Sequence, residues 1–185
     1  QYDERSVKYT KAYRSTKDIQ ILDRKSFELL EQDSIDTGIG NRMPLLKSYR
    51  GQVWTKIYKK DFLDKYSLSA KPKLRRSQDV MFSLEVYHYA VKGIMIPEVL
   101  YHYRITDNSI SHQYNENQIP RITCLMDEMG EYLKRIGKME MYHDLYEMRI
   151  AITLAQFCIQ DFCHPYNPQK YGVRKKRFLA KRTEA

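Results

Sequence analysis

The fold is decided by residues 77–105, which read SQDVMFSLEVYHYAVKGIMIPEVLYHYRI. A serine stands at the N-cap position of a predicted helix over 78–92, and Gly93 follows where a C-terminal cap is expected. Two strand-like runs come next, over 94–96 and 99–105. The stretch therefore predicts a helix that leads into strands.

The sequence upstream of this stretch predicts shorter elements. Asp23 precedes an apolar pattern that is typical of a helix over 24–31, and a loop with two glycines follows over 33–44. Residues 53–58 alternate between two faces, which predicts a strand, and 60–66 predict a short helix.

Downstream, apolar residues recur at helical spacing in two series that Gly137 separates, and this pattern predicts a helical hairpin. The first series consists of Ile122, Leu125, Met126, Met129, Leu133 and Ile136. The second consists of Met141, Leu145, Met148, Ile152, Ala155, Ile159 and Phe162. The tail from Lys170 onward is basic and has few apolar residues to pack.

The composition bounds the class of protein. With 185 residues, 42% hydrophobic and 30% charged, the chain has the size of one domain that buries about 70% of its unfolded surface. The mean hydropathy of -0.67 predicts no membrane-spanning helix, and no signal-peptide pattern opens the sequence. The three cysteines, Cys124, Cys158 and Cys163, include no Cys-x-x-Cys pair. This argues against a disulfide framework and a structural zinc site, and a reducing cytoplasm fits best.

The net charge is +9, and two short segments carry the excess. Residues 56–76 and 170–185 each sum to +6, and the first of them includes most of a basic surface loop over 67–77. A basic balance points to partners such as phosphates, nucleic acid or an anionic membrane. Because the sequence begins at Gln1 with a polar segment and no cap or turn, we expect a piece of a longer protein.

Asp79 is the first candidate for chemistry. It follows the basic loop and opens a predicted helix, where backbone N–H groups and the helix dipole favour the ionised carboxylate. Such a carboxylate can accept a proton. From position alone, a supporting role in the first helical turn is about three times as common as catalysis.

Arg104 and the hydroxyls of Ser109 and Ser111 form a set suited to phosphate. A guanidinium matches phosphate oxygens in a bidentate way, and serine donors add no charge. A surface arginine beside a serine-rich turn explains the same spacing equally well. His112 is a weaker candidate for a metal ligand, because most lone loop histidines bind nothing.

Trp54, Lys56 and Tyr58 share one face of the strand predicted over 53–58 and form a candidate surface for a sugar ring or a base. A single tryptophan in a strand is more often part of a core. The basic residues of 56–76 fit either nucleic acid or a solvated loop. The sequence has no Gly-x-Gly-x-x-Gly, P-loop or Gly-x-Ser-x-Gly motif, which excludes the corresponding enzyme classes.

Three sequence blocks, taken in order, resemble the C-terminal half of a family 2 glycosyltransferase of the GT-A fold. They are Val53-Trp54-Thr55-Lys56-Ile57-Tyr58-Lys59-Lys60-Asp61-Phe62-Leu63, then Gln78-Asp79-Val80-Met81-Phe82, then Leu100-Tyr101-His102-Tyr103-Arg104 with Ser109-Ile110-Ser111. Each block alone is weak, whereas together they cover residues 53–111 in the family's order. The resemblance implies an α/β fold, α+β by content, with a few short strands, several helices and a C-terminal helical hairpin.

The resemblance also implies roles for individual residues. In that family an acidic residue at the start of the corresponding helix is the general base, which here is Asp79, and Gln78 stands in place of the usual Glu. Similar enzymes hold the donor pyrophosphate with an arginine and serines after the tyrosine-rich strand, and the tryptophan block lies under the acceptor site. The substrate-binding residues implied are Trp54, Lys56, Gln78, Arg104, Ser109 and Ser111.

The family's Asp-x-Asp motif, which binds a divalent metal and the donor phosphates, has no counterpart in these 185 residues. We expect Mn²⁺ or Mg²⁺ in the intact enzyme, with ligands mostly outside this chain. We also expect that this chain alone neither binds a nucleotide sugar tightly nor turns it over.

The leading hypothesis is part of an inverting glycosyltransferase of the hexosyltransferase type. It would transfer sugar from a nucleoside diphosphate sugar to a glycan or lipid-linked acceptor in bacterial-type polysaccharide assembly. The alternative is a non-catalytic basic module that binds nucleic acid or an acidic partner. Under the leading hypothesis, 1–113 belong to the acceptor-side part of the GT-A domain, 114–169 form the hairpin and 170–185 the basic tail. We then expect a cytoplasmic protein without a nucleic-acid partner, its tail resting on the anionic inner face of a membrane.

Overall fold

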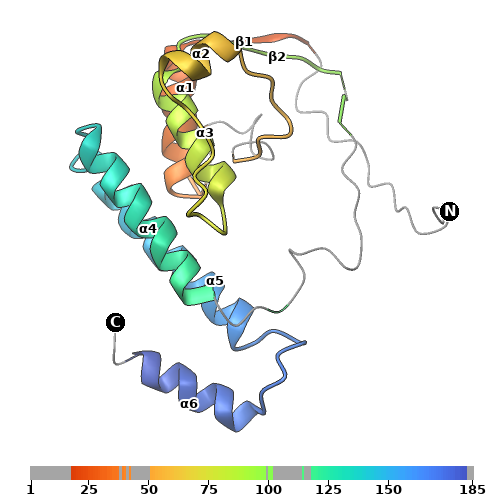
Figure 1. Ribbon diagram of the computed structural model, residues 1–185, viewed down its shortest axis with the longest axis vertical. Helices are drawn as coiled ribbons and strands as arrows, with labels where there is room; N and C mark the ends of the chain where they lie inside the picture. Colours follow the sequence, from red (N-terminus) through yellow and green to blue (C-terminus); the bar gives the residue numbers. More distant parts are fainter. Residues whose placement is uncertain are drawn as a thin grey trace, which may run out of the picture.

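The computed structural model describes residues 18–37, 39–40, 42, 51–98, 100–101, 114 and 118–182. This part of the chain is a mixed helix and strand structure in which helices dominate. Its sheet has two antiparallel strands, and six helices accompany it (Figure 1). The elements are, in order, β1 (Gln20–Leu22), α1 (Arg24–Ile35), α2 (Lys60–Lys65), α3 (Gln78–Tyr89), β2 (Gly93–Met95), α4 (Gln118–Arg135), α5 (His143–Asp161) and α6 (Tyr171–Arg182).

The two strands join the beginning of α1 to the end of α3. β1 pairs with β2 in a register that sets Ile21 opposite Ile94. Asp23 then caps α1, because its Oδ1 accepts a hydrogen bond of 2.9 Å from the backbone N–H of Ser26. The inner face of the ribbon is tight, since a Cβ on Gly93 would lie 2.8 Å from Cζ of Phe27. The ribbon therefore holds α1 and α3 side by side.

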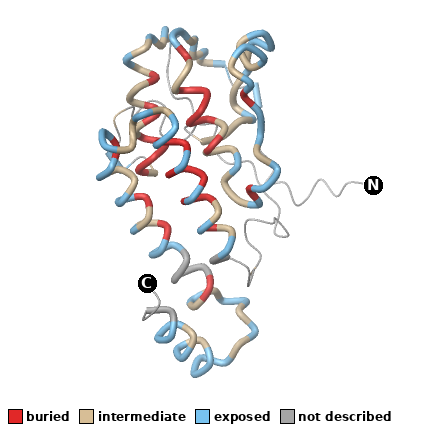
Figure 2. Tube along the Cα trace, turned by 60° about the vertical axis from the view of Figure 1, so that its left-hand side comes forward, coloured by how far each residue is buried: buried red, intermediate tan, exposed pale blue. Residues whose placement is uncertain are grey.

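The main hydrophobic core lies where α1 and α3 meet the hairpin of α4 and α5 (Figure 2). Its fully buried members include Ile35 of α1, Met81 and Leu84 of α3, and Met129 and Leu133 of α4. Burial of each such side chain contributes about 1.5 to 3 kcal/mol. The hairpin is thus packed on the α1–α3 pair rather than set apart from it.

A second cluster packs beneath the sheet and around α2. Phe27, Leu30, Val86 and Tyr87 are buried there between α1 and α3. Leu68, in the loop after α2, is buried with them. This cluster fixes the direction in which α3 runs from its first turn to the ribbon.

The helical hairpin predicted from periodicity is confirmed. α4 and α5 pack together, and the turn between them contains Gly137 at φ +68°, a left-handed conformation that favours glycine. The short helix predicted over 60–66 is present as α2, and the helix predicted from Gln78 begins there. The fold class is confirmed only at the level of mixed helix and strand structure.

Three predictions of local structure are wrong. Residues 53–58 form no strand, because the N–H of Lys56 donates to the Val53 carbonyl at 3.2 Å and closes a turn. α3 ends at Tyr89 with Ala90 as its C-cap, and Gly93 belongs to β2 instead. α1 continues to Ile35, four residues beyond the predicted end, because Ile35 belongs to the main core.

The basic tail forms a helix that the sequence did not suggest. α6 follows the end of α5 and lies beyond it at the far end of the molecule (Figure 1). Among the described residues, no helix combines the length and the apolar character needed to cross a membrane.

Candidate functional site

The first turn of α3 holds Asp79, the proposed base. Ser77 occupies the N-cap position as predicted, but its side chain makes no capping bond and its backbone is left-handed, at φ 54° and ψ 28°. Non-glycine residues adopt this conformation at a cost in free energy, and such positions concentrate at functional sites. Asp79 is half-buried, and its Oδ1 accepts a 3.0 Å hydrogen bond from the N–H of Val80. Gln78 beside it is exposed.

The segment that carries Trp54 and Lys56 folds against this turn. A Cβ on Gly51 would lie 2.9 Å from Cγ2 of Val80, so the backbone at Gly51 approaches α3 as closely as a glycine allows. The hydroxyl of Thr55 donates to the carbonyl of Gln52 at 3.2 Å and tightens the turn that follows. Residues 51–56 therefore lie beside the first turn of α3.

Lys56 points inward although its neighbour Ile57 is 96% exposed. Its Nζ donates to the carbonyl of Gln52 and lies 5.9 Å from the centre of the Tyr87 ring. Burial lowers the pKa of Lys56 to about 8, and the negative charge of Asp79 opposes this shift. An amine and a carboxylate from separate segments thus lie near enough at the start of α3 for their charges to interact.

Trp54, two residues before Lys56, forms an aromatic pair with Tyr101. The rings of Trp54 and Tyr101 lie 4.7 Å apart, centre to centre, and are tilted by 31°. Both remain partly open to solvent, with Trp54 36% exposed and Tyr101 49% exposed. The exposure favours the binding-surface interpretation of Trp54 over the core interpretation, because a sugar ring or a base can stack on exposed aromatic faces.

We define the Asp79 cluster as Trp54, Lys56, Gln78, Asp79 and Tyr101. Tyr101 belongs to it although the sequence analysis did not select it as a site residue. The signal that could have found it is the tyrosine-rich run in which it occurs. Its pairing with a tryptophan 47 positions earlier depends on tertiary structure alone.

Positive charge accumulates just before the cluster. Burial lowers the pKa of Arg76, and the positive charge of Arg121 lowers it further, which means that the two guanidinium groups lie near each other. Two neighbouring guanidinium groups suit an anion such as phosphate. The sequence pointed to Arg76 through the charge of the basic loop but gave no reason to select Arg121 on α4.

Part of the basic loop is bound to the protein itself. The amine of Lys71 lies 2.8 Å from Oε1 of buried Glu85, and Lys73 pairs with buried Glu128. Leu74 of the same loop is fully buried in the main core. The loop is therefore not simply solvated, and the charge available to a partner is smaller than the sequence sum suggests.

Several predicted site residues lie outside the described part of the chain. They are Arg104, Ser109, Ser111 and His112, so the expected pyrophosphate site and the weaker metal ligand stay predictions. Among the described residues, no group of three His, Cys, Asp or Glu side chains could hold a metal ion. The described residues do not fit the divalent metal that the resemblance implies.

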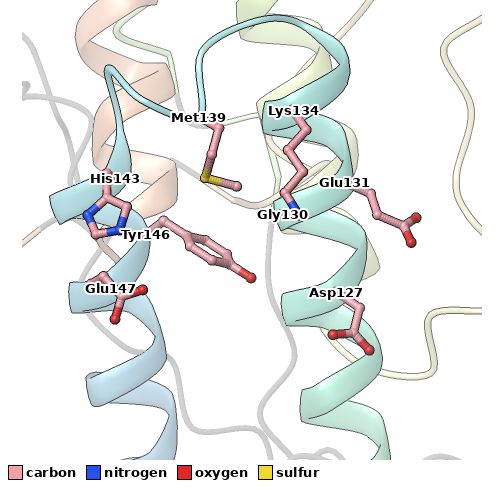
Figure 3. A pocket seen from close by; sticks show the side chains of 8 residues that line it. All are labelled: Asp127, Gly130, Glu131, Lys134, Met139, His143, Tyr146 and Glu147. Carbon is pink, nitrogen blue, oxygen red and sulfur yellow. The ribbon is translucent and has the colours of Figure 1, made fainter.

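A cavity of about 400 Å³ opens between α4 and α5, near the turn of the hairpin (Figure 3). The lining residues are Asp127, Gly130, Glu131, Lys134, Met139, His143, Tyr146 and Glu147. The hydroxyl of Tyr146 donates to the Met126 carbonyl at 2.9 Å, and a Cβ on Gly130 would lie 2.8 Å from that hydroxyl. Tyr146 thus fills the space between the helices, and no residue of the Asp79 cluster lines this cavity.

Comparisons with protein-family models, curated proteins and solved structures find no match to this chain.

Proposed function

We propose that this chain contributes the acceptor side of an inverting glycosyltransferase, with Asp79 as the general base. The observation that carries the proposal is the convergence of Lys56 and Asp79. They come from two of the three blocks that resemble family 2 enzymes, and the negative charge of Asp79 raises the pKa of Lys56. Chance sharing of a motif would not require these two blocks to meet in space.

The proposed reaction needs one proton acceptor on this chain. The oxygen of an acceptor hydroxyl attacks the anomeric carbon of a nucleoside diphosphate sugar, and the bond from that carbon to the phosphate oxygen breaks. The electrons of that bond leave with the nucleoside diphosphate, and the hydroxyl proton passes to the carboxylate of Asp79. Attack from the side opposite the leaving group inverts the configuration at the anomeric carbon.

The other members of the cluster take supporting roles. Below a pH of about 8, Lys56 carries a positive charge at the start of α3, near the carboxylate of Asp79. The Trp54–Tyr101 pair offers exposed rings on which an acceptor sugar can stack. The acceptor is proposed to be a glycan or a lipid-linked sugar, as in polysaccharide assembly.

The test is transfer by the enzyme that contains this chain, measured as release of nucleoside diphosphate. The donors would be a panel of uridine and guanosine diphosphate sugars. Replacement of Asp79 by Asn should lower turnover by about two to four orders of magnitude while donor binding is retained, because only the proton acceptor is lost.

The matched control is Asp64→Asn, which removes an exposed carboxylate whose ion-pair partner among the described residues is Lys60 on the same helix. Its turnover should stay within about twofold of the parent enzyme. Equal turnover of the Asp79→Asn variant and this control would contradict the proposal. Absence of turnover with every donor in the parent enzyme would count against it as well.

A further inference from the structure

One side of α6 is fixed to the end of α5. Nη2 of Arg177 lies 3.0 Å from Oδ2 of Asp161, which is fully buried. Nη1 of Arg174 donates to the carbonyl of Phe162 at 2.9 Å. The ring of Phe178 packs edge-on against Phe162, with centres 5.3 Å apart. These contacts set the orientation of α6, and they engage Arg174 and Arg177 in bonds within the protein.

The other side of α6 is open to solvent. Tyr171, Lys175 and Leu179 follow one another at intervals of four residues and thus form a single row along the helix, and Lys176 begins the adjacent row. All four are exposed, Tyr171 by 72% and Leu179 by 42%. We call these four residues the outer face of α6.

The outer face combines cations with apolar side chains and lacks any opposing charge. The helix sequence YGVRKKRFLAKR contains six Lys or Arg residues and no Asp or Glu. A partner bound by charge alone, such as nucleic acid, would require only the lysines and not the apolar side chains. Helices that lie in the surface of a bilayer use both kinds of group, because apolar side chains enter the headgroup boundary while cations stay beside the phosphates.

We propose that the outer face of α6 binds the surface of an anionic membrane. Charge complementarity selects the lipid class, since each Lys or Arg near an anionic surface contributes to binding and a neutral surface offers no such gain. Tyr171 and Leu179 supply the shallow apolar contact. The inference is independent of the glycosyltransferase proposal, because it uses no residue of the Asp79 cluster.

The experiment is sedimentation of the full chain with phosphatidylcholine vesicles that contain or lack phosphatidylglycerol. Binding should require the anionic lipid. The double variant Lys175→Gln, Lys176→Gln should bind about 25-fold more weakly, or about fivefold for each lysine. The matched control Lys25→Gln, Lys92→Gln removes two exposed charges that lie outside α6, and it should change binding by less than about twofold.

A third variant separates membrane contact from charge alone. Leu179→Gln leaves every charge in place, and it should weaken binding about tenfold if the side chain enters the bilayer surface. Equal losses in the two double variants, or equal binding to neutral and anionic vesicles, would overturn the proposal. It would also be overturned if Leu179→Gln bound like the parent chain, or if duplex DNA displaced the chain from the vesicles.

Discussion

The two ends of α3 differ in how their charged groups are compensated by hydrogen bonds and ion pairs. At its C-terminal end, Nη1 of Arg24 donates to the carbonyls of Tyr87, His88 and Ala90 at 3.0, 2.7 and 2.9 Å. These carbonyls would otherwise lack partners, and a cation at this end also suits the helix dipole. At its N-terminal end, Ser77 makes no side-chain cap, and the amine of Lys56 and the carboxylate of Asp79, both partly buried, lie near each other.

Near the C-terminal end of α3, the buried carboxylate of Glu31 on α1 has several partners. Glu31 is 0% exposed, and its Oε2 lies 2.7 Å from Nζ of Lys138. Its Oε1 lies 3.1 Å from Nδ1 of His88, and the hydroxyl of Tyr142 donates to Oε2 at 3.4 Å. We call this group the Glu31 junction. It joins α1, α3 and the α4–α5 hairpin, so its charges serve the fold.

The Asp79 cluster differs because its central charge is held at a cost to stability. Burial lowers the pKa of Lys56 to about 8, which means that the folded protein disfavours the charged amine. A fold gains nothing from such a group, whereas a site that handles a proton or an anion does. The comparison therefore predicts that removing charge at the two ends of α3 will have effects of opposite sign.

The largest effect is expected for Glu31→Ala. The variant leaves Lys138, His88 and Arg24 without their shared carboxylate, and loss of one partner from a buried charge network costs about 3 to 5 kcal/mol. The control is Glu28→Ala, which removes only the half-exposed partner of Arg24 on α1 and should cost less than about 1 kcal/mol. Chemical denaturation of both variants measures the difference. Similar losses would show that the junction is not what joins the elements.

The next effect is expected for Lys56→Met, and it is a gain. At pH 7 the folded state holds Lys56 protonated at the cost that its lowered pKa reflects, so an uncharged side chain of similar length should raise the free energy of unfolding by about 2 kcal/mol. Lys71→Met is the matched control, because it takes one cation away from buried Glu85 and Glu128, which keep only Arg135 and Lys73 as ion-pair partners among the described residues. It should lower that free energy by about 2 kcal/mol. A loss in both variants would contradict the comparison.

The pH dependence of the gain follows from linkage. The pKa of Lys56 is 10.5 in its ordinary state and about 8 in the folded protein, so between these pH values the unfolded chain binds more protons. Stability contributed by Lys56 therefore rises with pH across this window, and the penalty is present in full below pH 8. The advantage of Lys56→Met over the parent chain should shrink as the pH increases from 8 to 10.

Patterns along the chain predicted the parts of the fold that depend on repeated burial. The hairpin was predictable because Leu125, Met129 and Leu133 recur at helical spacing and all three enter the core. The strand expected over 53–58 failed for the opposite reason. Its alternation placed Trp54, Lys56 and Tyr58 on one face, but the turn leaves Lys56 partly buried and Ile57 exposed. Local pattern cannot anticipate a partly buried amine whose neighbouring carboxylate comes from another segment.

The candidate site was predictable where its residues carry a local signal in the sequence. Asp79 and Lys56 were selected from sequence, and the structure places them together, because a carboxylate at a helix start and a conspicuous block of sequence are local signals. Tyr101 and Arg121 were not selected, since their partners Trp54 and Arg76 are distant in sequence. α6 was missed because its apolar residues are few, and its contacts to Asp161 and Phe162 depend on tertiary structure.

The central claim is that the charges of Lys56 and Asp79 interact at the start of α3, and titration of Lys56 by NMR tests it most directly. With lysine labelled at Cε and Nζ, Lys56 should titrate with a pKa of about 8. Because the charge of Asp79 raises this pKa, Asp79→Asn should lower it further, whereas the control Asp64→Asn should leave it unchanged. A Lys56 that titrates near 10.5, or one that does not respond to Asp79→Asn, would contradict the account.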